Sequence, residues 1–230
     1  IINSMNVQKG TPLVITNGWG FADALSVSSA AACEKYPIFM TDNGGLSEDN
    51  KDVISNIEPS KVYVIGGQSS ISDSVVNEVK SLQPSLTDSN IVRLGGQTRY
   101  DTSLSICKYF NSNSNSTILA NGANFPDALS GSALASKLSA PIMLTDGRDI
   151  SKQKGYIDEK GYKDIFLLGG LNSIDLSVEY LLKPTSSVPK SEIDYITALK
   201  GYCDSYEDKT NTASTHMEDV YNKTTDIRVA

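Results

Sequence analysis

A long passage of this sequence occurs twice, and the repetition restricts the folds that the chain can adopt. Residues 17–44 read NGWGFADALSVSSAAACEKYPIFMTDNG, and residues 121–147 read NGANFPDALSGSALASKLSAPIMLTDG. Matching residues, such as Phe21 and Phe125, lie 104 positions apart throughout. We therefore expect two tandem copies of one unit, each larger than the repeats of about 20 to 50 residues that build solenoids.

Within each copy, short apolar segments alternate with segments typical of helices. The first copy passes through strand-like PLVIT, helix-like ADALSVSSAAACEK, strand-like PIFMT, helix-like SEDNKDVISNI and strand-like KVYVIGG. The last segment also returns, because VYVIGGQSSIS at 62–72 matches IFLLGGLNSID at 165–175 with an offset of 103. This alternation predicts an α/β fold in which right-handed crossovers build parallel sheets flanked by helices on both faces.

The composition limits the classes of partner. The 230 residues, 39% of them hydrophobic, are enough for one large domain or two smaller ones with cores of their own. A net charge of −7 disfavours nucleic acid or an anionic membrane as the main partner. The sequence shows no signal peptide, and no apolar run reaches the roughly 18 residues of a membrane span, so we expect no membrane insertion. Three widely spaced cysteines do not indicate a disulfide framework.

The segment RLGGQTRYDTSLSICKYF, residues 93–110, joins the two copies. Its Gly-Gly turn leads into an Arg99-Tyr100-Asp101-Thr102 box that opens a helix with apolar residues on one side. The same box in the first copy falls before residue 1, so we expect the first unit to lack the start of a helix, through cleavage or excision. The exposed apolar surface that this leaves is expected near Ile1, Ile2 and Met5, unless self-association hides it.

The ordered set of boxes resembles a known family. Gly-x-x-Phe-x-Asp-Ala-Leu-Ser, then Pro-Ile, Thr-Asp, a strand ending in Gly-Gly and an Arg-Tyr-x-Thr box are similar to the cell-wall-binding repeat type 2 of clostridial surface proteins, over residues 1 to about 183. The resemblance implies tandem Toprim-like or Rossmann-like α/β repeats, typically three around a pseudo-threefold axis. It also implies a secreted, non-catalytic module that holds S-layer, adhesin or autolysin proteins at the cell wall of a Gram-positive bacterium.

The implied partner is an anionic cell-wall polysaccharide or a teichoic-acid-like polymer, with other surface-layer proteins or a missing third repeat as further partners. No cofactor is implied. The domain organisation that we expect is an N-terminally incomplete first repeat at 1–94, a second repeat at 95–184, and a linker with a polar helical tail of unknown role at 185–230.

The residues predicted to bind the polymer are polar side chains near the starts of the repeated helices, where backbone N–H groups favour anions. Arg99 suits a phosphate or carboxylate, and Tyr100 suits stacking on a sugar; alternatively, Arg99 pairs with an acidic residue of the adjoining unit while Tyr100 fills the junction. The predicted ligand-binding set is Arg99, Tyr100, Thr102, Asp127, Ser130, Asp23 and Ser26, together with Arg93 as a further local cation.

Repeated carboxylates support an alternative function. Asp42 and Asp146 follow predicted strands at the sheet edge where α/β proteins bind ligands, and with Asp23 and Asp127 they would hold Mg²⁺ in a Toprim-like phosphotransfer or nucleotide-binding enzyme. A simpler interpretation is that Asp23 and Asp127 cap helices while Asp42 and Asp146 make Asx-turns. We favour the binding module over the enzyme.

Other motifs of catalytic or phosphate sites are weak in this sequence. Gly66-Gly67 and Gly169-Gly170 match no full phosphate-binding motif, and a tight turn with positive φ is the favoured interpretation. His216 is the sole histidine and lies outside the repeats, which disfavours a catalytic triad or a zinc site.

Overall fold

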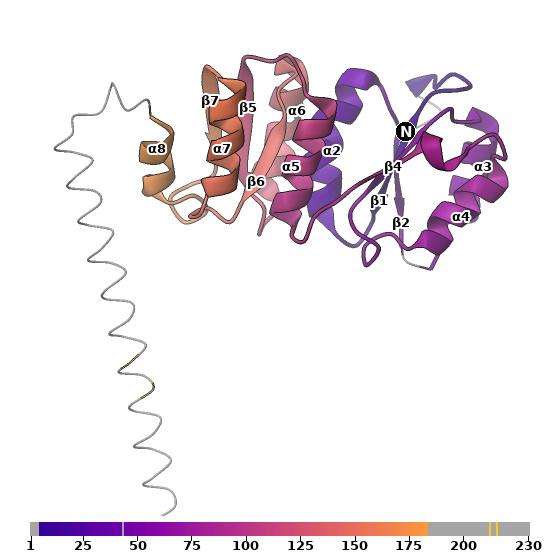
Figure 1. The fold of residues 1–230 in the computed structure, drawn as a ribbon, viewed down its shortest axis with the longest axis horizontal. Coiled ribbons are helices and arrows are strands. Elements are labelled where there is room, and N and C mark those ends of the chain that lie inside the picture. The colour runs from indigo at the N-terminus through magenta and orange to yellow at the C-terminus, as the bar shows by residue number, and fades with distance from the viewer. Residues whose placement is uncertain (1–4, 43, 184–211, 213–214, 216–230) are drawn as a thin grey trace, which may run out of the picture. The chain divides into compact units, whose positions relative to one another are not determined.

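Two parallel β-sheets form the frame of the protein in the computed structural model, which describes residues 5–42, 44–183, 212 and 215 (Figure 1). The chain divides into two units, Ile1–Leu182 and Lys183–Ala230, and both sheets belong to the first unit. The predicted tail at 185–230 therefore lies outside the described residues, apart from Thr212 and Thr215. The predicted boundaries at 94/95 and 184/185 stay predictions.

The first sheet has four strands in the order β2-β1-β3-β4, and the second has three in the order β6-β5-β7. All neighbouring strands are parallel, as predicted. The strands are β1 (Leu13–Asn17), β2 (Ile38–Thr41), β3 (Val62–Ile65), β4 (Ile91–Leu94), β5 (Ser116–Asn121), β6 (Ile142–Thr145) and β7 (Asp164–Leu168).

Helices connect the strands in the same order in both copies. The elements from β5 to α8 repeat those from β1 to α4, which confirms the tandem α/β repeat; the Toprim-like label stays a prediction. A short 3₁₀ helix, η1, precedes β4. The helices are α2 (Phe21–Glu34), α3 (Glu48–Ile57), α4 (Asp73–Leu82), α5 (Arg99–Phe110), α6 (Pro126–Leu138), α7 (Ser151–Lys160), α8 (Leu176–Leu182) and η1 (Asp88–Asn90).

The strand register is also repeated. Val14 of β1 pairs with Ile38 and Tyr63 on its two sides. Ile118 of β5 pairs with Ile142 and Phe166, which occupy the equivalent positions of the second copy. Because a one-residue slip would exchange the two faces of a strand, the shared register shows that equivalent residues of the two copies lie on the same face of their sheets.

Each sheet is covered on both faces, because alternate side chains of a strand point in opposite directions. In the first sheet, Leu13 and Ile15 belong to a core cluster with α3 and α4, whereas Val14 belongs to a cluster with α2 and α5. In the second sheet, Leu119 packs with α5, α7 and α8, and Ile118 packs with α6 and α2. Helices α2 and α5 are therefore shared by the two sheets.

We call the contact region of α2, α5, α6 and β6 the seam between the repeats (Figure 1). In α2, Val27 and Ala31 face the first sheet while Ala22 and Leu25 face the second. The Ser29 hydroxyl donates to the Ala140 carbonyl at 2.6 Å across the seam. The many Ala and Ser residues of α2 permit this close approach.

The two repeats differ in what covers equivalent positions. Leu25 on α2 is 8% exposed at the seam, whereas its counterpart Leu129 on α6 is 53% exposed. The reverse holds on the edge strands β2 and β6, where Met40 is 57% exposed and its counterpart Leu144 is 1% exposed against α2 and α5. Each repeat thus buries at the seam a face that the other leaves open.

The structure describes one of the three residues at which an exposed apolar surface was predicted. Met5 is exposed, whereas Ile1 and Ile2 lie outside the described residues. The alternative of self-association stays a prediction. In the described part of the chain, no helix has both the length and the apolarity of a membrane span.

Candidate binding site

Arg99 is the first residue of α5 and joins the two repeats. Thr98 caps the helix, accepting a hydrogen bond from the Asp101 N–H while the Asp101 carboxylate accepts from the Thr98 N–H. From this position, Arg99 Nη1 donates to the Gly122 carbonyl at 2.6 Å. Its guanidinium carbon also lies 5.6 Å from the centre of the Phe21 ring in the first repeat. Arg99 is therefore held at the seam by residues of both repeats.

Two phenylalanine rings meet beside this arginine. Phe21 and Phe125, which are equivalent residues of the two copies, meet edge to face with ring centres 5.9 Å apart. Phe125 is exposed, so the pair leaves an apolar surface open to solvent. Tyr100 packs against the seam cluster, and its ring lies so close to Gly122 that a Cβ there would be 3.0 Å from it. Tyr100 thus fills the junction, the second of the two predicted arrangements.

Asp23 adds a partly buried carboxylate beside Arg99. Burial raises the pKa of Asp23, and the positive charge of Arg99 opposes that rise without cancelling it. The carboxylate reaches the turn after β3, where a Cβ on Gly66 would lie 2.6 Å from Asp23 Oδ2. The Asp23 carboxylate therefore lies where the loss of hydrating water disfavours its charged form.

This carboxylate gives stability a pH dependence. A raised pKa in the folded state means that protonated Asp23 favours folding below the ordinary value of 3.8, and that this contribution is lost as pH rises through the folded pKa. We therefore expect Asp23→Asn to raise the melting temperature at pH 7 and to lose that advantage at pH 3. Asp127→Asn is the matched control on α6, and a lower melting temperature for Asp23→Asn at pH 7 would contradict the prediction.

The prediction that Asp23 and Asp127 cap helices is wrong. Gly20 and Phe125 hold the N-cap positions, and both aspartates lie in the first helical turn instead. Asp127 repeats the placement of Asp23, because a Cβ on Gly169 would lie 3.0 Å from its carboxylate oxygen. Both carboxylates therefore sit over the Gly-Gly turn of their own repeat.

The remaining predicted ligand residues do not join Arg99 in one cluster. Ser26 is buried and donates to the Ala22 carbonyl within α2, and Thr102 is buried in α5. Ser130 is exposed on α6 and donates to the Asp127 carbonyl at 3.0 Å. Arg93 donates to the carbonyls of Gly66 and Ile71 and pairs with Asp73 at 3.0 Å, so it secures the loop after β3.

Asp42 and Asp146 make the Asx-turns of the simpler interpretation. Asp42 Oδ1 accepts from the Gly44 N–H at 2.7 Å, and Asp146 Oδ1 accepts from the N–H groups of Arg148 and Asp149. Among the residues that the structure describes, no three His, Cys, Asp or Glu side chains are placed to hold a metal ion. The predicted magnesium alternative thus finds no carboxylate cluster there.

Two asparagines that the sequence interpretation missed organise the sheet edge. Asn17 donates to the Ser70 carbonyl at 2.9 Å and accepts from the Trp19 N–H, and Asn121 makes the equivalent bonds to Ser173 and Ala123. Each ties the end of the first strand to the loop after the third. The Asn-Gly pair that opens both repeated passages was the available signal.

The Gly-Gly turns in those loops have the predicted geometry. Gly66 has a φ of +105° and Gly169 a φ of +147°, values that side chains rarely adopt. This confirms the interpretation of both pairs as tight turns.

Proteins of known sequence and structure share this architecture. The chain is 30% identical to the N-acetylmuramoyl-L-alanine amidase LytC of Bacillus subtilis (strain 168) over 74% of its length and 33% of the relative's. The amidase enhancer of the same organism is 29% identical over 72% of this chain and 22% of the relative. The chain therefore spans a third or less of these curated relatives.

Two solved structures from Clostridium difficile have similar folds. Cwp6 has a TM-score of 0.67 and 28% identity, over 72% of this chain and 26% of that one. Cwp8 has a TM-score of 0.69 and 24% identity, over 79% and 30% of the two chains, and supports the fold alone. The family model described as cell wall binding domain 2 matches residues 1–76 and 93–179, one match to each repeat. The chain therefore belongs to the cell wall binding domain 2 family.

Proposed function

We propose that this chain is a non-catalytic anchor that holds a larger secreted protein on an anionic polymer of the Gram-positive cell wall. The observation that carries the proposal is the match of both repeats to the cell wall binding domain 2 family. Wall binding places the chain at the cell surface. Two linked units support anchoring, because weak contacts to a repetitive polymer strengthen one another when they are joined. The greater length of the relatives supports a cargo outside the matched segment.

The binding site that we propose for the polymer centres on Arg99, with Asp23, Tyr100 and the start of α6 beside it. An acidic protein attracts an anion only through local positive groups. Arg99 supplies one at a helix N-terminus, and within the described residues only its Nη1 is engaged in a hydrogen bond. The exposed Phe125 offers an apolar surface to a sugar ring. The desolvated carboxylate of Asp23 further supports a functional site, since such sites often retain groups that do not favour folding.

Retention on purified walls tests this site. We expect Arg99→Ala to weaken retention by about 1 to 3 kcal/mol, or roughly 5- to 150-fold, the range for losing a charge-assisted hydrogen bond. Arg148→Ala is the matched control, because it removes the same charge from an exposed loop. Walls stripped of their anionic polymer should retain neither the wild type nor the variants.

Stability must be measured on the same proteins, because Arg99 also joins the repeats. We expect Arg99→Ala to lower the melting temperature, so retention is compared at a temperature where every variant is folded. A lower melting temperature with unchanged retention would reject Arg99 as a ligand residue and leave it a seam residue. Equal retention of the wild type on intact and stripped walls would reject the anionic polymer as the partner.

A further inference from the structure

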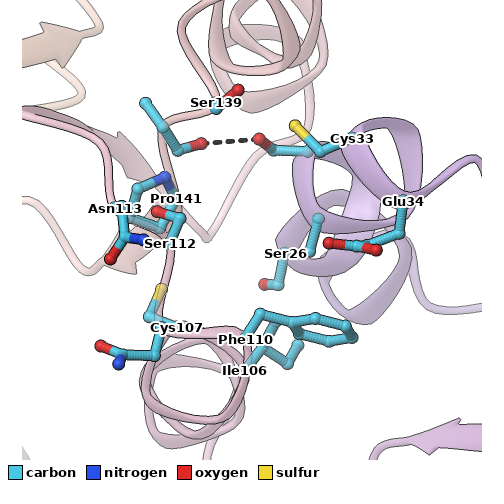
Figure 2. A pocket seen from close by; sticks show the side chains of 14 residues that line it. Ser26, Cys33, Glu34, Ile106, Cys107, Phe110, Ser112, Asn113, Ser139 and Pro141 are labelled. Atoms are coloured by element: carbon cyan, nitrogen blue, oxygen red, sulfur yellow. Dashed lines mark hydrogen bonds between the residues drawn. The ribbon is translucent and has the colours of Figure 1, made fainter.

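A cavity of about 310 Å³ opens at the seam, between the C-terminal half of α2, the end of α5 and the segment before β6 (Figure 2). We call it the seam cavity, and Glu34, Ile106, Phe110, Ser112 and Pro141 are among its lining residues. It lies at the opposite end of α5 from Arg99, and the 12 residues of this helix span roughly 17 Å. The seam cavity is therefore separate from the site proposed around Arg99.

One polar group in the seam cavity lacks a hydrogen-bond partner. The Ser112 hydroxyl is buried and makes no hydrogen bond. By contrast, Ser29 and Ser26, which also line the cavity, donate to the carbonyls of Ala140 and Ala22. A buried hydroxyl without a partner is unfavourable, and a rotation about the Ser112 Cα–Cβ bond that turns it into the cavity would let a ligand donate or accept there.

The charge of the seam cavity selects against anions. Among the described residues that line it, Glu34 is the one charged side chain, and no Lys, Arg or His is present. Helices α2 and α5 also end at its rim, at Glu34 and Phe110, where the helix dipole is negative. A ligand must therefore bring hydrogen-bond donors or a positive charge, rather than a phosphate or carboxylate.

Part of the remaining wall is apolar and suits the C–H face of a sugar ring, while Asn111, Asn113 and Ser139 add further polar groups. Phe110 and Ile106 lie together at the end of α5, Pro141 lies beside Ser112 on another side of the space, and Glu34 lies across from Ser112 (Figure 2). Apolar walls with a few convergent polar groups are typical of small-molecule sites, and the volume is at the lower end of their range. One hexopyranose unit has the required size and its hydroxyl groups provide the required donors.

We propose that the seam cavity binds a single sugar unit, preferably an amino sugar with a protonated amine directed to Glu34 and a hydroxyl directed to Ser112. This proposal rests on the proposed function, because it makes the sugar a unit of the wall polymer. It assigns the anionic groups of the polymer to the Arg99 end of the seam and its donor-rich sugar to the other end. The specificity of an acidic anchor would then depend on sugar identity as well as on charge.

Cys33 provides a direct probe, because it is exposed and lines the seam cavity. Cys107 also lines it but is buried, and burial raises the pKa of its thiol to about 12, so it should not react with iodoacetamide. In the full chain carrying Cys203→Ser, we expect millimolar glucosamine to slow alkylation of Cys33 severalfold and to saturate. Glucose should protect more weakly, and glucose 6-phosphate should not protect.

Substitutions in the seam cavity separate a loss of its charge from a loss of folding. Glu34→Gln should reduce the protection of Cys33 by glucosamine to the level given by glucose. Glu48→Gln on the distant α3 should leave the protection by either sugar unchanged. Ala30→Trp should fill the cavity and abolish the glucosamine binding measured by calorimetry. Melting temperatures of all variants confirm folding.

Two outcomes would overturn the proposal: no protection by glucosamine, or equal protection by glucose 6-phosphate. If the wild type is still retained on walls in either case, the seam cavity is not the sugar site and the anchoring function stands. Loss of wall retention by the wild type would instead reject the anchoring function itself.

Discussion

Leu25→Ala should lower the free energy of unfolding by about 2 to 4 kcal/mol, whereas Leu129→Ala should lower it by less than about 1 kcal/mol. The two leucines hold the same position in the two repeats, so helix propensity and local sequence are nearly matched. Leu25, however, packs at the seam with Ile118 and Leu144 of the other repeat, while Leu129 is exposed. Urea unfolding at equilibrium, with both the midpoint and the slope recorded, measures the two losses.

The comparison also tests whether the open face of α6 stays open in solution. Equal losses for Leu25→Ala and Leu129→Ala would contradict the exposure of Leu129 and show that a second copy or another segment covers it. Sedimentation velocity over a range of concentrations distinguishes these cases, because only self-association depends on protein concentration.

The seam is a head-to-tail contact, which explains why equivalent residues differ in exposure. The first repeat contributes α2 and the second contributes α5, α6 and β6, so different surfaces of the same unit meet. Such a contact leaves one surface of each kind without a partner. Met40 marks the open surface of the first repeat, and Leu129 marks that of the second.

The fold was predictable because the repeat restricted it. An offset of 104 and then 103 positions between the two copies predicted that every strand and helix of one returns in the other, and the shared register of Val14 and Ile118 agrees with this. The seam was not predictable in the same way. Leu25 and Leu129 stand in nearly identical sequences, and only the neighbours that the fold brings to α2 decide which one is buried.

The candidate sites show the same limit. The Arg99 box was found from the sequence, which left ligand binding and seam packing as alternatives, and the structure adds that both repeats contact Arg99. Asp23 and Asp127 were misplaced as caps because Asp is a favoured N-cap residue, whereas the helices begin earlier and leave the cap positions to Gly20 and Phe125. The seam cavity combines three separated segments, none of which carries a motif of its own.

Gly147→Ala should be the most destabilising of these substitutions, with a loss of about 4 kcal/mol or more. Gly147 has a φ of +89°, and a Cβ there would lie 2.0 Å from the Ser173 carbonyl oxygen. That carbonyl accepts from Asn121, so relieving the overlap would also break the bond that ties β5 to the loop before α8. Gly10→Ala is the matched control, because its φ is +83° and no atom lies within 4 Å of its added Cβ. Gly10→Ala should lower the free energy of unfolding by about 1 kcal/mol. Equal losses in urea unfolding would assign the effect to backbone strain alone and contradict close packing at the edge of the second sheet.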